Sequence, residues 1–381
     1  MTYKTLRNFV FALHRYIGLA VGLIAIIIGL TGSLLIFRSE IITHQNHDQI
    51  VTIIPQGKML PIEVVLNTVR NRYASQPDAK LNRVYVPTKP DEPFNVIYAT
   101  QKNDWIENSV HPYTGAFLIS NNLKPSLLER FYDVIYKLHF SLLAGDIGNK
   151  IAGTAGLLMS ILTITGIFLW PGWRNFLSGF KIKWNAHPKR VNFDIHKVAG
   201  VIAGVFLFFT FFTGFCWNFG EFSEPFIRAI TFSPHPQEPV SQLISNQSPV
   251  KLNEQLQIGQ AQLPGAELRS VYFPQKPDSA LMIRYKFPQE TDDGGKSYVY
   301  LDRYSGKVLR VDNAIKPLLG DRILNSFEPL HYGTFGGLPT RILYVFVGLT
   351  PLILFITGFV MWQYRKRPTP DFSQVRKNSW N

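Results

Sequence analysis

The chain has 381 residues, 46% of them apolar, yet its mean hydropathy is only +0.03. A net charge of +13 suggests nucleic-acid binding in an ordinary globular protein, but here the cations cluster beside strongly apolar segments. We therefore expect no nucleic-acid partner. The single cysteine, Cys216, excludes an intrachain disulfide, a four-cysteine iron–sulfur cluster and haem attachment through a C-x-x-C-H motif.

Four apolar segments predict membrane-spanning helices. The first runs uncharged from Ile17 to Phe37, long enough to cross ~30 Å of hydrocarbon at ~1.5 Å per residue. The others are Ile151–Trp170, Ile195–Phe219 and Ile342–Trp362. Lys4 and Arg7 resemble the start of a signal peptide, but no small-residue cleavage site follows the first run, which we interpret as an uncleaved anchor. The prediction is a four-span bundle surrounded by membrane lipid.

Two polar segments separate the spans. In the first, Pro61–Arg72 predicts an amphipathic helix, and Asn82–Pro87 and Phe94–Thr100 predict strands of a small antiparallel sheet. His111–Leu118 predicts a turn leading into a last strand. Lys124–Phe140 then predicts an amphipathic helix before the second span. Each polar segment is therefore expected to form an α+β domain.

The second half of the chain repeats the first. Five residues recur at one offset (196 − 14 = 182): His14, Gly18, Gly22, Thr31 and Gly32 return as His196, Gly200, Gly204, Thr213 and Gly214. A second set recurs at another offset (331 − 139 = 192): Leu138-His139-Phe140 returns as Leu330-His331-Tyr332, and Thr165-Gly166 as Thr357-Gly358. This pattern predicts an internal duplication with parallel repeats, related by an axis along the membrane normal.

The predicted organisation follows the repeat. It consists of a span (1–38), a polar domain (39–123), an amphipathic helix with the second span (124–172), a linker (173–192), the third span (193–220), a second polar domain (221–315), an amphipathic segment with the fourth span (316–363) and a tail (364–381). The flanking cations lie on one side: Lys4, Arg7, Arg15, Arg174, Lys181, Lys183, Lys189, Arg190, Arg365, Lys366 and Arg367. The positive-inside rule makes that side cytoplasmic, with both termini, and puts the polar domains outside.

Four of the nine histidines occupy repeated positions beside the spans. His14 and His196 form a cytoplasmic-side pair, and His139 and His331 form an outer pair. Histidines at membrane depth are costly, and two imidazoles from facing helices hold b-type haem without any cysteine. We predict two haem b groups with these four residues as axial iron ligands. The alternative is that each histidine is an interfacial polar residue bonded to a backbone carbonyl.

Other residues are assigned roles around these cofactors. The glycines one and two turns beyond each histidine would leave room for a flat macrocycle. Arg15 and Lys197, with Tyr16, are candidates for the haem propionates on the inner side, and Lys150 and Arg341 on the outer side. The alternative for these cations is topology and snorkelling. The chain has no G-x-G-x-x-G after a strand, no H-E-x-x-H and no G-x-S-x-G, which favours electron transfer over other chemistry.

These motifs resemble one family. HRYIGL at His14, HKVAGV at His196, the T-G-x-x-x-W endings at Trp170 and Trp362 and the Tyr-Thr-Gly turn at Tyr113 are similar to the PepSY-associated transmembrane helix proteins. Members of that family include inner-membrane ferric-siderophore reductases with two haems b. The resemblance implies a bacterial inner-membrane protein with two periplasmic PepSY-like domains that reduces the Fe³⁺ of a ferric siderophore and releases Fe²⁺. It leaves the electron donor open, either cytoplasmic or a quinol.

Two other functions stay open. The chain is compatible with a non-enzymatic PepSY-type binding or regulatory membrane protein, or with a transporter built on parallel repeats. Neither function requires four paired histidines. The spans hold few charges, and Pro351 is the main proline within them, which does not favour a transporter.

Overall fold

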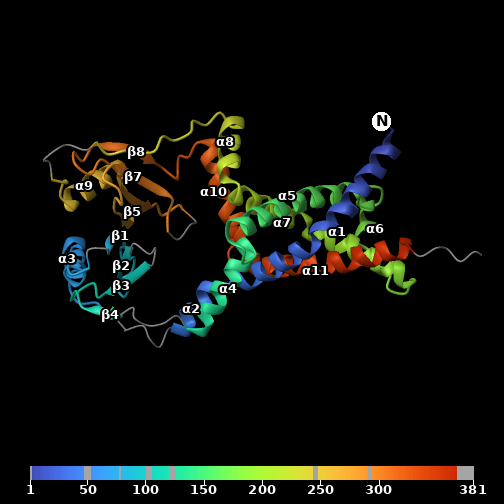
Figure 1. Ribbon diagram of the computed structural model, residues 1–381, viewed down its shortest axis with the longest axis horizontal. Coiled ribbons are helices and arrows are strands. Elements are labelled where there is room, and N and C mark those ends of the chain that lie inside the picture. Colours follow the sequence, from blue (N-terminus) through green and yellow to red (C-terminus); the bar gives the residue numbers. More distant parts are fainter. Residues whose placement is uncertain are drawn as a thin grey trace, which may run out of the picture. The chain divides into compact units, whose positions relative to one another are not determined.

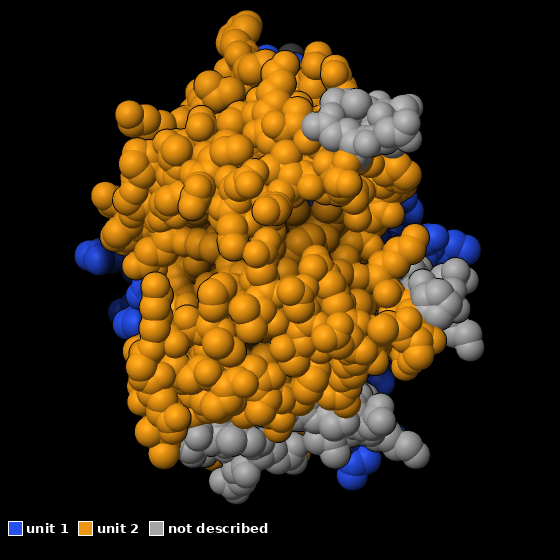
Figure 2. All heavy atoms as spheres, turned by 90° about the vertical axis from the view of Figure 1, so that its left-hand side faces the viewer, with its two compact units in different colours: residues 1–41, 127–230, 323–381 blue, residues 42–126, 231–322 orange. Residues whose placement is uncertain are grey.

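The structure is a computed structural model that describes residues 2–46, 53–76, 79–99, 105–119, 126–242, 248–290 and 294–366 (Figure 1). The chain divides into two compact units, coloured separately in Figure 2. The helical unit comprises residues 1–41, 127–230 and 323–381. The sheet unit comprises residues 42–126 and 231–322. Each unit is thus assembled from segments of both halves of the chain.

Four long apolar helices dominate the helical unit (Figure 1). They are α1 (Tyr3–Leu35), α5 (Gly145–Leu169), α7 (Pro188–Asn218) and α11 (Leu338–Lys366). The shortest has 25 residues, about 37 Å at 1.5 Å per residue, which exceeds the ~30 Å of a hydrocarbon core. The prediction of four spans is confirmed, and the chain is a multi-pass membrane protein.

The four helices pack around a common interior. Helix α1 packs against α5 and α11, and α7 packs against the same two helices, so α1 and α7 lie diagonally across the bundle. At Gly29 of α1 a Cβ would lie 2.5 Å from the carbonyl oxygen of Gly348 in α11. Membrane helices without a side chain at a contact can approach closely in this way. Buried side chains from all four helices, including Ala25, Met159 and Leu207, complete the bundle core.

Shorter helices accompany the bundle: α2 (Arg38–Asn46), α4 (Leu127–Ser141), α6 (Phe176–Phe180), α8 (Gly220–Ile230) and α10 (Leu319–Tyr332). Helices α4 and α10 are the predicted amphipathic helices before the second and fourth spans. Helix α8 belongs to the helical unit, so the second polar segment enters the sheet unit at 231, ten residues after the predicted start at 221. Leu142 and Leu143, at φ 50° and 60°, reverse the chain between α4 and α5.

The sheet unit contains one antiparallel sheet of eight strands in the order β4-β3-β2-β1-β5-β6-β7-β8. The strands are β1 (Lys80–Tyr85), β2 (Phe94–Ala99), β3 (Trp105–Val110), β4 (Phe117–Ile119), β5 (Glu267–Tyr272), β6 (Leu281–Lys286), β7 (Ser297–Leu301) and β8 (Val308–Asp312). The sequence predicted a small sheet in each polar segment and did not identify β3. In the structure β1 and β5 pair, with Val84 opposite Val271, and unite both halves.

One face of this sheet is covered by the helices α3 (Ile62–Arg72) and α9 (Leu252–Gln262). Because side chains alternate along a strand, Val84, Val96 and Ile283 point to the helix-covered face of the sheet. There they form a buried core together with Leu66 of α3. The alternate residues, Tyr85, Asn95 and Arg284 among them, lie on the opposite face. The predicted helix at Pro61–Arg72 is therefore confirmed, with the α+β character of the unit.

Candidate functional site

The first histidine pair lies inside the helical bundle. His14 of α1 and His196 of α7 have ring centroids 6.3 Å apart and ring planes at 86°. Because α1 and α7 are diagonal, two side chains that meet between them occupy the bundle interior. The structure thus brings together the two residues that the sequence paired, although 182 positions separate them (196 − 14 = 182).

The second pair is formed by the shorter helices. His139 near the end of α4 and His331 near the end of α10 have ring centroids 6.1 Å apart and ring planes at 74°. His139 contacts Thr31 of α1, which follows His14 by 17 residues (31 − 14 = 17). At ~1.5 Å per residue this is about 25 Å along α1. The two pairs therefore lie toward opposite ends of the bundle.

Each histidine is held by one threonine hydroxyl on a neighbouring helix. The Nδ1–Oγ1 distances are 3.0 Å for His14 and Thr165, 3.1 Å for His139 and Thr31, 2.8 Å for His196 and Thr357 and 2.8 Å for His331 and Thr213. The sequence assigned no role to these threonines. A signal existed, because they recur at the same offsets as the histidines (213 − 31 = 182; 357 − 165 = 192).

The spacing of each pair fits coordination of a single metal ion by two imidazoles. Metal–imidazole bonds are about 2.0–2.1 Å long, so two nitrogens on opposite sides of one metal lie about 4 Å apart. Adding the distance from each nitrogen to the centre of its ring gives a centroid separation of about 6 Å. No group of three or more His, Cys, Asp or Glu suited to a metal occurs in the part of the chain that the structure describes. Haem iron needs only two protein ligands, since its macrocycle supplies four nitrogens. The donor set therefore fits bis-imidazole haem.

Arg15 adds a second observation that fits this cofactor. Its Nε is buried and has no hydrogen-bond partner among the described residues, although it follows His14 directly. Its guanidinium carbon lies 4.6 Å from the ring centroid of the exposed Tyr16. A buried cationic N–H without an acceptor is costly, and a propionate is the kind of anion that would satisfy it.

Lys197, the other predicted propionate partner, has different partners in the structure. Its Nζ donates to the carbonyl oxygens of Ser178 and Lys181 at 3.1 and 3.0 Å, and to Asp194 Oδ1 at 2.9 Å. An ammonium has three protons, and all three are used. The Lys197 and Asp194 side chains are 3% and 0% exposed, so this ion pair fixes the loop around α6 to α7. We therefore do not assign Lys197 to a propionate.

The two predicted outer cations also have protein partners. Lys150 Nζ lies 2.6 Å from Glu221 Oε1. Arg341 donates to the Glu40 carboxylate, and this hydrogen bond lowers the pKa of Glu40 to about 2. The structure thus gives both cations a carboxylate on a neighbouring helix, which agrees with a role in helix packing.

The glycines predicted to make room for a macrocycle face other side chains. A Cβ at Gly18 or Gly200 would lie 3.6 Å from Leu162 of α5 or Leu354 of α11, and Gly22 faces the ring of Phe355. Different glycines face the histidine rings, as described below. The prediction named the glycines on the same helix as each histidine, whereas the glycines that face the rings belong to neighbouring helices. The sequence does not specify which helices are neighbours, so it did not identify these glycines.

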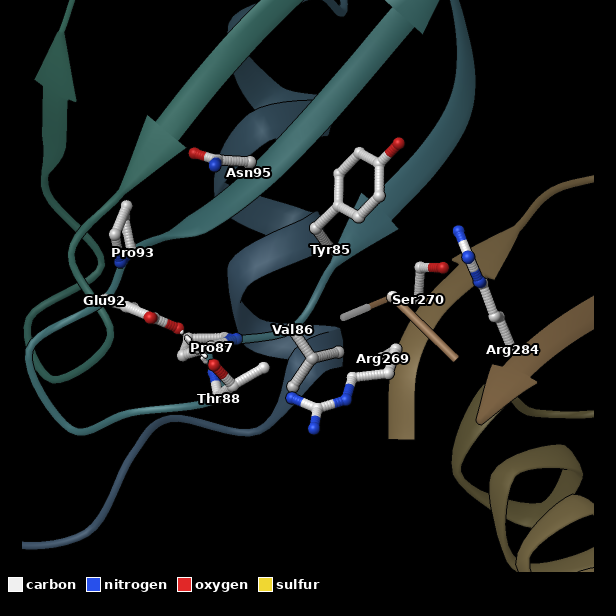
Figure 3. Close-up of a pocket in the computed structure, with 11 residues that line it drawn as sticks. Tyr85, Val86, Pro87, Thr88, Glu92, Pro93, Asn95, Arg269, Ser270 and Arg284 are labelled. Atoms are coloured by element: carbon white, nitrogen blue, oxygen red, sulfur yellow. Dashed lines mark hydrogen bonds between the residues drawn. The ribbon is translucent and has the colours of Figure 1, made fainter. Parts of the chain in front are cut away.

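The sheet unit holds a pocket of about 330 Å³ where the two halves of the sheet meet (Figure 3). Its lining includes Tyr85, Thr88 and Asn95 from the first half and Arg269, Ser270 and Arg284 from the second. Arg269 extends toward Val86 and Thr88 (Figure 3), with its Nη2 2.9 Å from Glu267 Oε2. Its Nε is buried without a hydrogen-bond partner in the described ranges. The lining thus carries the cationic side chains of Arg269 and Arg284, which suit an oxygen-bearing ligand.

Fold and site together define a class: a multi-pass membrane protein with four apolar helices, facing histidine pairs in its helical unit, and an α+β sheet unit. The chain belongs to the family described as PepSY-associated TM region, whose sequence profile matches residues 11–365. The match includes all four paired histidines and confirms the resemblance found in the sequence. A comparison with curated proteins gives no match.

Proposed function

We propose that this protein transfers electrons across a bacterial inner membrane through two haem b groups and reduces the Fe³⁺ of a siderophore at the periplasmic face. The observation that carries the proposal is the pair of facing imidazoles at each end of the bundle, with centroids 6.3 and 6.1 Å apart. Of the two ring nitrogens, only Nδ1 has a hydrogen-bond partner within the described part of the chain. Nε2 is left available to a metal.

The residues favour electron transfer over binding of a substrate to the cofactor. Haem supplies one-electron redox chemistry when it is bound. The paired histidines would hold each haem from two helices and would leave no position for a substrate to bind to it. The carbonyl contacts of His14 and His139 are those expected if the histidines were only interfacial polar residues, but that alternative gives no reason for the rings to be paired.

Reduction would itself release the metal. Hard oxygen ligands hold Fe³⁺ more strongly than Fe²⁺, because the lower charge attracts them less. One electron converts the bound Fe³⁺ to Fe²⁺ and leaves the chelator unchanged. We propose that the chelate binds in the pocket between the two halves of the sheet, whose lining includes the cationic side chains of Arg269 and Arg284. The electron donor is a cytoplasmic reductant or a quinol.

The proposed orientation has both termini and the linker around α6 in the cytoplasm and the sheet unit in the periplasm. The cations flanking the helices support it through the positive-inside rule. Cys216 is buried, so cysteines introduced at the exposed Asp91 and Asn185 can be labelled separately. In spheroplasts an impermeant maleimide should label Asp91→Cys and should reach Asn185→Cys only after lysis. The opposite pattern would reverse the orientation.

The proposed function has a direct test. Purified wild-type protein should show a reduced-minus-oxidised spectrum of six-coordinate b-type haem, with two haems per chain. Anaerobic mixing of the reduced protein with a ferric hydroxamate should reoxidise the haem and release Fe²⁺, trapped by a ferrous-specific chelator. Protein without haem would point to the PepSY-type binding or regulatory function or to a transporter, and the proposal would be abandoned.

A further inference from the structure

The helical unit contains four Thr-Gly dipeptides, and each lies against one of the four paired histidines. The dipeptide and the histidine always come from different helices. The pairs are Thr165-Gly166 of α5 with His14, Thr357-Gly358 of α11 with His196, Thr31-Gly32 of α1 with His139, and Thr213-Gly214 of α7 with His331. Four occurrences of one contact indicate a common role.

The threonine hydroxyl proton is directed away from the histidine. Thr357 Oγ1 donates to the carbonyl oxygen of Ile353 at 2.7 Å, and Thr213 Oγ1 donates to that of Phe209 at 2.6 Å. A hydroxyl has one proton, so toward His196 and His331 each threonine accepts. The Nδ1 of each ring must then carry the hydrogen, which leaves the lone pair on Nε2.

For the other two histidines, a contact with a backbone carbonyl indicates the same tautomer. His14 Nδ1 lies 3.2 Å from the carbonyl oxygen of Leu162, and His139 Nδ1 lies 2.9 Å from that of Ile28. A carbonyl oxygen only accepts, so Nδ1 must be the donor. All four rings thus have Nε2 as the nitrogen free to bind a metal.

The glycine of each dipeptide provides the space that its histidine ring occupies. A Cβ added at Gly32 or Gly166 would lie 3.0 or 3.1 Å from Cε1 of His139 or His14. At Gly214 and Gly358 the corresponding distances are 3.4 and 3.5 Å, the range of ordinary contact. At Gly32 and Gly166 even a methyl group would press on the ring, and at Gly214 and Gly358 a methyl group would fill the remaining contact distance. The glycine and the threonine together therefore limit where the imidazole lies.

We propose that the four Thr-Gly dipeptides are the positioning elements of the two haem sites. This inference rests on the proposed function and assigns it eight further residues. Each threonine selects the Nδ1–H tautomer and each glycine admits the ring, so that Nε2 is directed at the opposing histidine. A hydrogen bond from the distal N–H also makes an imidazole a stronger donor to the metal, which stabilises the ferric state.

The test compares three variants on α11. Thr357→Val removes the hydroxyl at nearly constant shape, Thr357→Ser keeps it, and Thr350→Val removes the hydroxyl of another buried threonine, which donates only to Phe346. Full-length apoprotein in nanodiscs is titrated with haemin. Thr357→Val should weaken binding at the inner site about 10- to 100-fold and raise the reduction potential of that haem, whereas Thr357→Ser and Thr350→Val should behave like the wild type.

A second measurement does not depend on haem. In ¹⁵N-histidine-labelled apoprotein, the nitrogen shifts of His196 should show a single Nδ1–H tautomer in the wild type and in Thr357→Ser, and a mixture in Thr357→Val. Wild-type binding, potential and tautomer in Thr357→Val would overturn the inference. A wild-type protein that binds no haem but shows the Nδ1–H tautomer would contradict the proposed function and leave the role of the threonine supported.

Discussion

Replacing His14 and His196 together by Ala is expected to remove one of two haems while the protein still inserts into the membrane. The two rings face each other inside the helical bundle, and their centroids are 6.3 Å apart. Without the two imidazoles, neither side chain of this pair would hold a haem. Haem content per chain, measured by the pyridine haemochrome method, should fall by about half.

The matched control is His235→Ala, since His235 is an exposed loop residue of the sheet unit. This variant should keep the full haem content. The single variants His14→Ala and His196→Ala should either lose the inner haem or hold it with an altered spectrum. Full haem content in the double variant would show that the inner pair binds no haem, whatever the remainder of the chain does.

Replacing His139 or His331 is expected to stop reduction of the ferric chelate and to leave the inner haem reducible from the donor side. Helices α4 and α10 directly follow segments of the sheet unit along the chain, so their histidines are the pair next to the proposed chelate site in sequence. The experiment is stopped-flow. The reduced variant is mixed anaerobically with a ferric hydroxamate, and haem reoxidation is followed.

Reoxidation in His139→Ala and His331→Ala should fall to the rate seen without chelate, and the haem content should fall by one per chain. His111→Ala is the control, because His111 lies in the sheet unit, where its Nδ1 accepts hydrogen bonds from the backbone N–H groups of Tyr113 and Thr114. This variant should reoxidise as fast as the wild type. Fast reoxidation in the His139 or His331 variant, or an unchanged haem count, would require an electron path that avoids these residues.

The comparison of sequence and structure is informative at the polar segments. The alternation of Phe94–Ala99 was sufficient to predict a strand with one buried face, and Ile62–Arg72 showed helical periodicity. Strand β3, with Trp105, Glu107 and Asn108, alternates less clearly and was not predicted. The pairing of β1 with β5 joins residues nearly 190 positions apart (271 − 84 = 187), and no local pattern specifies such a partner.

The tertiary contacts give Lys197 and Arg15, the two cations that follow the paired histidines, different surroundings. Lys197 follows a paired histidine and sits in a cationic flank, which favoured a propionate role. Its three protons instead reach Ser178, Lys181 and Asp194. Arg15 has the same sequence context beside His14, yet its buried Nε has no protein acceptor in the described regions. Sequence context alone did not distinguish the two cations. Lys197 is bound by carbonyl oxygens beside α6, and the position of that segment next to α7 is a property of the tertiary structure.

The sequence by itself determined the four spans, the family and the identity of the paired histidines. Hydropathy is a local property of the chain, and the two constant offsets, 182 and 192, join each histidine to its partner without a structure. Only the tertiary structure decided that α1 and α7 lie diagonally, that Thr357 holds His196 and that glycines of neighbouring helices face the rings. Those contacts depend on which helices pack together and in what rotation, and this is set by side chains distant in sequence that meet only in the folded protein.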